Sequence, residues 1–108
     1  MGECVFCKII NKEMASDKVY EDDRVLAFKD IEPKAPIHFL IVPKKHIASI
    51  ESEKSEEVAK ELISVAKKIA KEKGISGYKL VFNVGREGGQ FVDHLHLHFL
   101  AGKPVQFP

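Results

Sequence analysis

The segment from His94 to His98 alternates histidine with leucine, and imidazole is the side chain best suited to proton transfer or nucleophilic attack near neutral pH. In a β-strand, alternate side chains share one face. A strand through this segment would place His94, His96 and His98 on one face and turn the leucines towards the core. Three interpretations are open: the polar side of a half-exposed strand, a metal site in which two histidines bind one zinc ion, or catalysis by an imidazole base or nucleophile.

A glycine-rich segment just before the histidines favours catalysis on a phosphate. Gly85, Gly88 and Gly89 allow backbone N–H groups to approach an anion without a Cβ atom in the way. Asn83 and Gln90 flank these glycines with amide hydrogen-bond donors. A plain hairpin would also use glycine, so the loop alone is weak support. Together with the histidines it predicts a phosphoryl-transfer site.

The cysteines Cys4 and Cys7 are separated by two residues and could be zinc ligands, a redox pair or two core residues. A redox pair of this spacing usually follows a strand in a βαβ unit, and no strand is expected before Cys4. A structural zinc ion takes four ligands, commonly sulfur mixed with imidazole. His46 and His94 are suitable further ligands, whereas His96 must stay free for chemistry.

The hydrophobic pattern predicts an α+β fold with a mainly antiparallel sheet in a single domain, residues 1–108. A long amphipathic helix is expected over 55–73, because apolar residues recur at helical spacing, lysines crowd its last turn and Gly74 follows. Most connections are too short for parallel crossovers. The other expected elements are a short helix within 6–14 and strands at 18–21, 25–28, 38–42, 79–83 and 94–100.

Charge and composition limit the kinds of partner that are expected. The formal net charge is +1, so neither a nucleic-acid polymer nor a membrane surface is expected as a partner. The N-terminus lacks the apolar run of a signal peptide, and no stretch is long enough to span a bilayer. We therefore expect a cytoplasmic protein whose two cysteines do not form a structural disulfide.

The stretch Asn83–Leu100, NVGREGGQFVDHLHLHFL, resembles the signature of the histidine triad (HIT) family. APIHFLIVPKKHI at Ala35–Ile47 is similar to a second block of that family, and FCKIINKE and YEDDRVLAFKDI match in order and spacing. The similarity is strongest to the histidine triad nucleotide-binding proteins, which are small homodimeric purine nucleoside phosphoramidate hydrolases. It implies a HIT-like fold: a mainly antiparallel five-stranded sheet with one long and one short helix, assembled as a homodimer.

The resemblance also implies roles for the histidines. His96 would attack the α-phosphate of a purine nucleotide and form a nucleotidyl-imidazole intermediate, which water then hydrolyses. His98 would contact the phosphate, and the backbone carbonyl of His94 would hold the ring of His96. A neutral imidazole is a good nucleophile and, once bonded to phosphorus, a good leaving group.

The remaining substrate contacts follow from the same resemblance. Asn83 and the amide groups around Gly89 and Gln90 would bind the phosphate, and Asp30 would bind the ribose hydroxyls. An apolar base pocket would consist of Phe6, Ile9, Phe28 and Ile31. Phe28 and Ile31 could equally be ordinary core residues.

Zinc-containing relatives use a cysteine pair with two histidines, the second lying two residues before the nucleophile. This favours a structural zinc ion held by Cys4, Cys7, His46 and His94, with no organic cofactor. His38, within an apolar strand, is expected to have a structural hydrogen-bonding role.

The chain departs from its relatives at Phe91, where a small polar residue is common, and at Phe107, where tryptophan is common. Phe91 can donate no hydrogen bond, so leaving-group recognition is open. The alternatives are a dinucleoside polyphosphate hydrolase, a nucleotide-binding or protein-interaction module with little turnover, and a zinc-stabilised scaffold whose histidines bind only metal.

Overall fold

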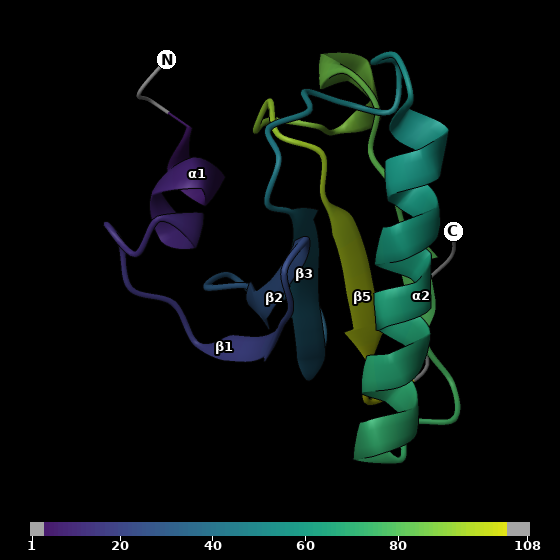
Figure 1. Cartoon of the computed structure of the whole chain (residues 1–108). Helices are drawn as coiled ribbons and strands as arrows, with labels where there is room; N and C mark the ends of the chain where they lie inside the picture. Colours follow the sequence, from purple (N-terminus) through teal and green to yellow (C-terminus); the bar gives the residue numbers. More distant parts are fainter. Residues whose placement is uncertain (1–3, 104–108) are drawn as a thin grey trace.

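The structure is a computed structural model that describes residues 4–103. Its strands form one antiparallel sheet in the order β1-β2-β3-β5-β4. The two α-helices lie on opposite faces of this sheet (Figure 1). The elements are α1 (Val5–Ile10), β1 (Lys18–Glu21), β2 (Val25–Lys29), β3 (Ile37–Pro43), α2 (Ser55–Lys73), β4 (Lys79–Val81), a 3₁₀ turn η1 (Arg86–Gly88) and β5 (Leu97–Ala101). The predicted α+β fold, with five antiparallel strands, one short and one long helix, is confirmed.

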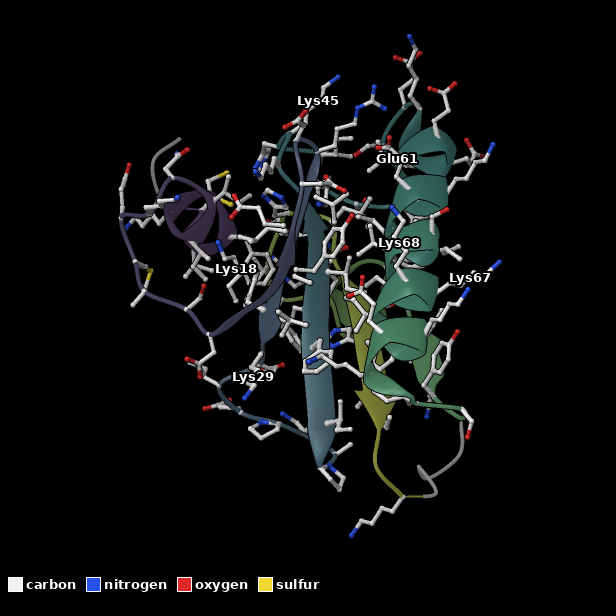
Figure 2. All side chains as sticks on the ribbon, turned by 60° about the horizontal axis from the view of Figure 1, so that its bottom comes forward. Lys18, Lys29, Lys45, Glu61, Lys67 and Lys68 are labelled. Carbon is white, nitrogen blue, oxygen red and sulfur yellow. The ribbon has the colours of Figure 1, made fainter. Side chains whose placement is uncertain are left out.

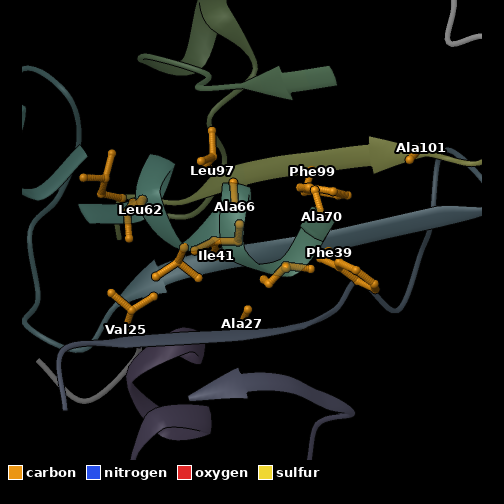
Figure 3. Close-up of a cluster of buried hydrophobic side chains, with 13 residues drawn as sticks. Val25, Ala27, Phe39, Ile41, Leu62, Ala66, Ala70, Leu97, Phe99 and Ala101 are labelled. Atoms are coloured by element: carbon orange, nitrogen blue, oxygen red, sulfur yellow. The ribbon is translucent and has the colours of Figure 1, made fainter. Parts of the chain in front are cut away.

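Because side chains alternate along each strand, the sheet has a separate hydrophobic core on each of its faces. In β2, Val25 and Ala27 point towards α2, whereas Leu26 and Phe28 point towards α1. The strand β3 alternates in the same way. Figure 3 shows the core on the α2 side, where Leu97 and Phe99 of β5 pack with side chains of β2, β3 and α2. Because neighbouring residues of a strand face opposite ways, this packing turns His98 to the α1 side of the sheet.

The helix α2 has the predicted bounds and packs through Leu62, Val65 and Ile69. It ends at Gly74, whose φ of 67° is the left-handed conformation that glycine adopts without strain. Lys67 extends from the helix away from the sheet (Figure 2). Glu61 instead accepts a hydrogen bond from Arg24 at the β1–β2 turn, and Nζ of Lys68 lies 5.9 Å from the ring centre of Tyr20 in β1. Within residues 4–103, no helix is long and apolar enough to cross a bilayer.

Two strand boundaries differ from the prediction by more than one residue. The strand β5 begins at Leu97 instead of His94, and β4 ends at Val81 instead of Asn83. The ladder between β3 and β5 stops at the pair Ile41–Leu97. Beyond it, Pro43 has no N–H to donate, and its carbonyl accepts a hydrogen bond from Nε2 of His94 instead (2.8 Å).

The segment before β5 is therefore shaped by local bonds. The backbone N–H of Leu95 donates to the carbonyl of Ile47 (2.6 Å), outside the sheet. The alternation nevertheless persists, because Leu95 still enters the α2-side core while His94 and His96 remain on the other side.

Candidate active site and metal centre

A cavity of about 610 Å³ opens on the α1 face of the sheet. Its walls come from α1, β2, the loop after β2, β3, β4 and the segment 89–98. Side chains from α1 and β2 make one part of the lining apolar (the apolar end), and the imidazoles of His96 and His98 together with Asn83 make another part polar (the polar end). The two parts meet where the ring of Phe6 lies 5.1 Å from that of His96. The cavity therefore joins an apolar compartment to a polar one, as a nucleotide requires.

The nucleophile candidate, His96, lies on the floor of this cavity with 8% of its surface exposed. Its Nδ1 is 2.8 Å from the backbone carbonyl of His94. A carbonyl only accepts, so Nδ1 carries the proton and Nε2 is left with a free lone pair. Burial lowers the pKa of His96 below its ordinary value, which keeps the ring neutral at pH 7. The contact expected for the His94 carbonyl is present.

The neighbouring imidazole, His98, has the opposite tautomer. The backbone N–H of Lys34 donates to Nδ1 of His38 (3.0 Å), so a neutral His38 carries its proton on Nε2. That Nε2 lies 3.0 Å from Nδ1 of His98. His98 therefore accepts at Nδ1 and carries its own proton on Nε2. Burial, followed by the nearby His96 and His38, lowers the pKa of His98 to about 4.

The residue that the sequence interpretation missed is His38. Its expected hydrogen bonds exist, but it also lines the cavity and contacts His98. Cross-strand pairs share a face, and His38 pairs with Leu100 while Leu40 pairs with His98. The register between β3 and β5 thus brings His38 to the catalytic face. Alternation within β3 alone could not reveal this register.

A carboxylate completes this group. Oδ2 of Asp30 is 3.4 Å from Nε2 of His38, and its Oδ1 accepts from the N–H of Glu32 (2.9 Å). The ligand atoms of Asp30, His38 and His98 lie within 4.8 Å of one another, close enough for a metal ion. The Lys34 N–H opposes that use, because it directs the His38 lone pair away from the other two residues. The group is better suited to hydrogen bonding with substrate.

The residues predicted for the base pocket all line the apolar end. Phe28 is buried and also belongs to the α1-side core, whereas Ile31 is 93% exposed at the cavity mouth. The ring of Phe6 meets Phe28 edge to face at 5.7 Å and His96 at 5.1 Å. The fourth residue, Ile9, packs beside them.

The glycine loop does not present its amides as predicted. The N–H groups of Gly88, Gly89 and Gln90 donate to carbonyls of Gly85 and Arg86 within the loop (2.9–3.1 Å). These bonds form because the loop winds into η1, which a sequence of glycines does not foretell. In this structure these three N–H groups are paired within the loop, and the binding of phosphate by amide groups around Gly89 and Gln90 stays a prediction.

Two residues of this region still face the cavity. Asn83 and Gly89 both line it, and Nδ2 of Asn83 donates one of its two hydrogens to the carbonyl of Gly88 (2.8 Å). Gly89 has a φ of 94°, and a Cβ there would lie 3.3 Å from Nδ2 of Asn83. Glycine is thus required at this close approach.

Gln90 has a different place from the one predicted. Its side chain is buried, does not line the cavity, and donates from Nε2 to the carbonyls of Ala48 (2.7 Å) and Val92 (3.0 Å). Its Oε1 accepts from the N–H of Gly85 (3.2 Å). Gln90 therefore ties the glycine loop to two other segments instead of binding phosphate.

The four residues predicted as zinc ligands converge. Sγ of Cys4 is 3.3 Å from Nδ1 of His94, and Sγ of Cys7 is 3.3 Å from Nδ1 of His46. All four ligand atoms lie within 4.8 Å of one another. Nε2 of His94 is held by the carbonyl of Pro43, so the lone pair on Nδ1 faces the sulfurs.

The donor set suits a divalent zinc ion. Burial, and then the adjacent Cys4 thiol, raises the pKa of Cys7 to about 11. Two thiolates so close together need a cation, and zinc accepts a mixed sulfur and imidazole set in tetrahedral geometry. Four protein ligands would leave no open position, so such an ion would be structural.

Comparison with known proteins agrees with this geometry. A family profile described as "Scavenger mRNA decapping enzyme C-term binding" matches residues 3–106. The chain is 47% identical over 107 residues to the purine nucleoside phosphoramidase of Escherichia coli strain K12, an alignment that covers 95% of this chain and 90% of that protein.

Solved structures give the same answer. A HIT family hydrolase from Legionella pneumophila superposes with a TM-score of 0.92 at 47% identity, covering 98% of both chains. A histidine triad protein from Clostridium difficile gives a TM-score of 0.94 at 49% identity, covering 100% of this chain and 97% of its own. The chain belongs to the HIT family and is one of its hydrolases.

The corrected role of Gln90 predicts a loss of stability. Gln90→Leu keeps the volume but leaves the carbonyls of Ala48 and Val92 and the N–H of Gly85 without their partner. The free energy of unfolding should fall by about 2–3 kcal/mol in a urea titration. The exposed neighbour Glu87, replaced by Gln, is the control and should change it by less than about 0.5 kcal/mol. Equal stability of both variants would contradict the role given to Gln90.

Proposed function

We propose that this enzyme hydrolyses purine nucleoside phosphoramidates through a nucleotidyl intermediate on His96. The observation that carries the proposal is the pair of opposite tautomers in one cavity: a lone pair on Nε2 of His96 beside a proton on Nε2 of His98. One imidazole can attack phosphorus while the other donates a hydrogen bond to the phosphate oxygens. The name of the Escherichia coli relative supports the substrate class.

In the first step, Nε2 of His96 forms a bond to the α-phosphorus while the P–N bond of the substrate breaks. The departing amine keeps the electron pair and takes up one proton. His98 and Asn83 stabilise the charge on the non-bridging oxygens from the polar end of the cavity. The His94 carbonyl stabilises the imidazolium character that develops on the ring of His96.

In the second step, a water molecule attacks phosphorus and the bond to Nε2 of His96 breaks. The water loses one proton, and the products are a nucleoside monophosphate and the free amine. One water is consumed in total. Each step exchanges a single bond at phosphorus, which divides one difficult displacement into two easier ones.

The rest of the cavity binds the nucleoside. Asp30, near the mouth, accepts hydrogen bonds from the ribose hydroxyls with the oxygen that faces His38. The purine lies between the apolar side chains of Phe6, Phe28 and Ile31. The edge-to-face pair of Phe6 and Phe28 supplies an aromatic wall.

Replacing His96 by Ala should reduce kcat/KM on adenosine and guanosine phosphoramidates by about a thousandfold or more, because the bond to phosphorus can no longer form. Binding of the nucleoside monophosphate, measured by calorimetry, should remain detectable. Rapid quenching of the wild-type enzyme should trap a nucleotidyl adduct on His96, seen by peptide mass spectrometry.

The control is Lys67→Ala on the outer side of α2, far from the cavity (Figure 2). Its turnover should stay within about twofold of the wild-type value, because surface substitutions usually have small effects. Near-normal kcat in the His96 variant would disprove the mechanism. Faster turnover of dinucleoside polyphosphates than of phosphoramidates would instead identify a dinucleoside polyphosphate hydrolase.

We also propose that Cys4, Cys7, His46 and His94 hold one structural zinc ion per chain, on the distances and lone-pair directions above. The metal would fasten α1, whose first turn is capped by Sγ of Cys4 (3.3 Å from the N–H of Cys7), to the segment that carries His94. It takes no part in either chemical step.

The double variant Cys4→Ser, Cys7→Ser should lose the zinc found by elemental analysis of protein purified without chelator. Its Tm should fall by roughly 10 °C, since the metal binds only the folded chain. A chelator should lower the Tm of the wild type but not that of the variant. Protein prepared without chelator and still free of zinc would exclude the site.

We further propose a homodimer with twofold symmetry. The edge strand β4 can pair with its copy, because a twofold axis makes such a pair antiparallel. Beside this edge, Ile63 of α2 is 40% exposed and Tyr78 36% exposed, which leaves an apolar surface for a partner to cover. Within the described residues, no other strand edge has comparable apolar neighbours on α2.

Light scattering at micromolar concentration should therefore give twice the chain mass of 12.1 kDa. Ile63→Glu should shift the mass towards the monomer, because it buries a charge in the interface. Ser64→Glu is the matched control, since Ser64 faces the groove between α2 and the β1–β2 turn on the other side of the helix. A monomeric wild type would rule out the dimer.

A further inference from the structure

Phe91 is an aromatic side chain at the mouth of the cavity with 73% of its surface exposed. Its neighbours are fixed: Gln90 is buried and hydrogen-bonded, and Val92 packs on the α1-side core. The ring therefore stands on a well-held backbone and faces solvent at the same cavity as His96. A large apolar group kept exposed at a binding cavity is expected to meet a ligand.

The direction of the reaction places the leaving group at this mouth. His96 lies on the cavity floor with 8% of its surface exposed. In displacement at phosphorus, the attacking and leaving atoms lie roughly in line. The group that departs must therefore lie on the side of phosphorus away from His96, which is the open side of the cavity.

Three large apolar side chains at the cavity are exposed, namely Met14, Ile31 and Phe91. Met14 follows α1 and Ile31 follows Asp30, so both belong to the nucleoside end. Phe91 comes from the segment that begins at Gly89, beside the polar end. Of the three, Phe91 is the one that lies on the same chain segment as Gly89 and His96, which line the cavity with it.

We propose that Phe91 is a specificity-determining residue that covers the leaving amine and favours aromatic or apolar amines over small ones. The inference rests on the proposed function and deepens it, since it concerns the amine of the same phosphoramidates. A phenyl ring has no hydrogen-bond donor or acceptor, so a bound amine is stabilised there only by the burial of apolar surface. An aromatic amine gains a ring contact there, whereas a small amine leaves the ring in water.

The test compares two adenosine 5′-phosphoramidates that differ only in the amine, benzylamine or methylamine. The quantity measured is the ratio of their kcat/KM values, which reports steps up to departure of the amine. After that step both substrates give the same intermediate on His96, so its hydrolysis cancels from the comparison. Phe91→Ser should lower the ratio of benzylamine to methylamine by about five- to tenfold.

Phe91→Leu should lower the ratio less, because it keeps an apolar side chain. The matched control is Ile31→Ser, an apolar residue at the mouth that is even more exposed than Phe91 (93% against 73%) and that we place on the nucleoside side. This substitution should lower kcat/KM for both substrates by the same factor, so that the ratio of the two values stays as in the wild type. Thermal unfolding should show that each variant is folded, because substitutions at such exposed positions change stability little.

The outcomes separate the two proposals. An active wild type whose ratio is the same in the Phe91→Ser variant overturns this inference alone. A ratio that falls equally in the Ile31→Ser variant also overturns it, because the effect would then not belong to Phe91. A wild type that hydrolyses neither compound overturns the proposed function and this inference with it.

Discussion

The site depends on where each imidazole carries its proton; main-chain groups decide this directly for His94, His96 and His38, and His38 in turn decides it for His98. The carbonyl of Pro43 accepts from Nε2 of His94, and the carbonyl of His94 accepts from Nδ1 of His96. The N–H of Lys34 donates to Nδ1 of His38. Each of these bonds leaves the second nitrogen with a defined role. A backbone group cannot change its donor or acceptor character with pH, so the assignment is stable. The alternation of lone pair and proton is what makes neighbouring histidines useful for different tasks.

The short helix α1 connects the cluster of proposed zinc ligands with the cavity that holds His96. Cys4 and Cys7 begin it, and Phe6 between them reaches edge to face towards both His94 (5.9 Å) and His96 (5.1 Å). A helix of this length is unstable by itself, so its position relies on the contacts it makes. Closure of the cysteines on His94 would therefore also place the aromatic wall of the base pocket. The proposed zinc ligands and the proposed base pocket therefore share one small element.

The predicted and observed sites differ most where the chain turns between strands. Gln90 and the glycine amides were expected at the phosphate, yet they hold the loop itself, because η1 closes its own hydrogen bonds. Strand β5 starts later than predicted since Pro43 cannot continue the ladder on the facing strand. Both errors concern backbone donors and acceptors, whose partners depend on loop geometry. Side-chain type indicates which groups are present, but not which are already paired.

The sequence by itself determined which residues lie on the two faces of the sheet. The alternation of His94, His96 and His98 with apolar residues, and the helical spacing of α2, follow from the strand and helix periods alone. The clustering of Cys4 and Cys7 with His46 and His94 was indicated by residue type and family resemblance. Only the tertiary structure decided that His38 faces His98, because that contact depends on the register between two strands 60 residues apart in the chain. Register and loop closure are long-range choices, and a local pattern carries no information about them.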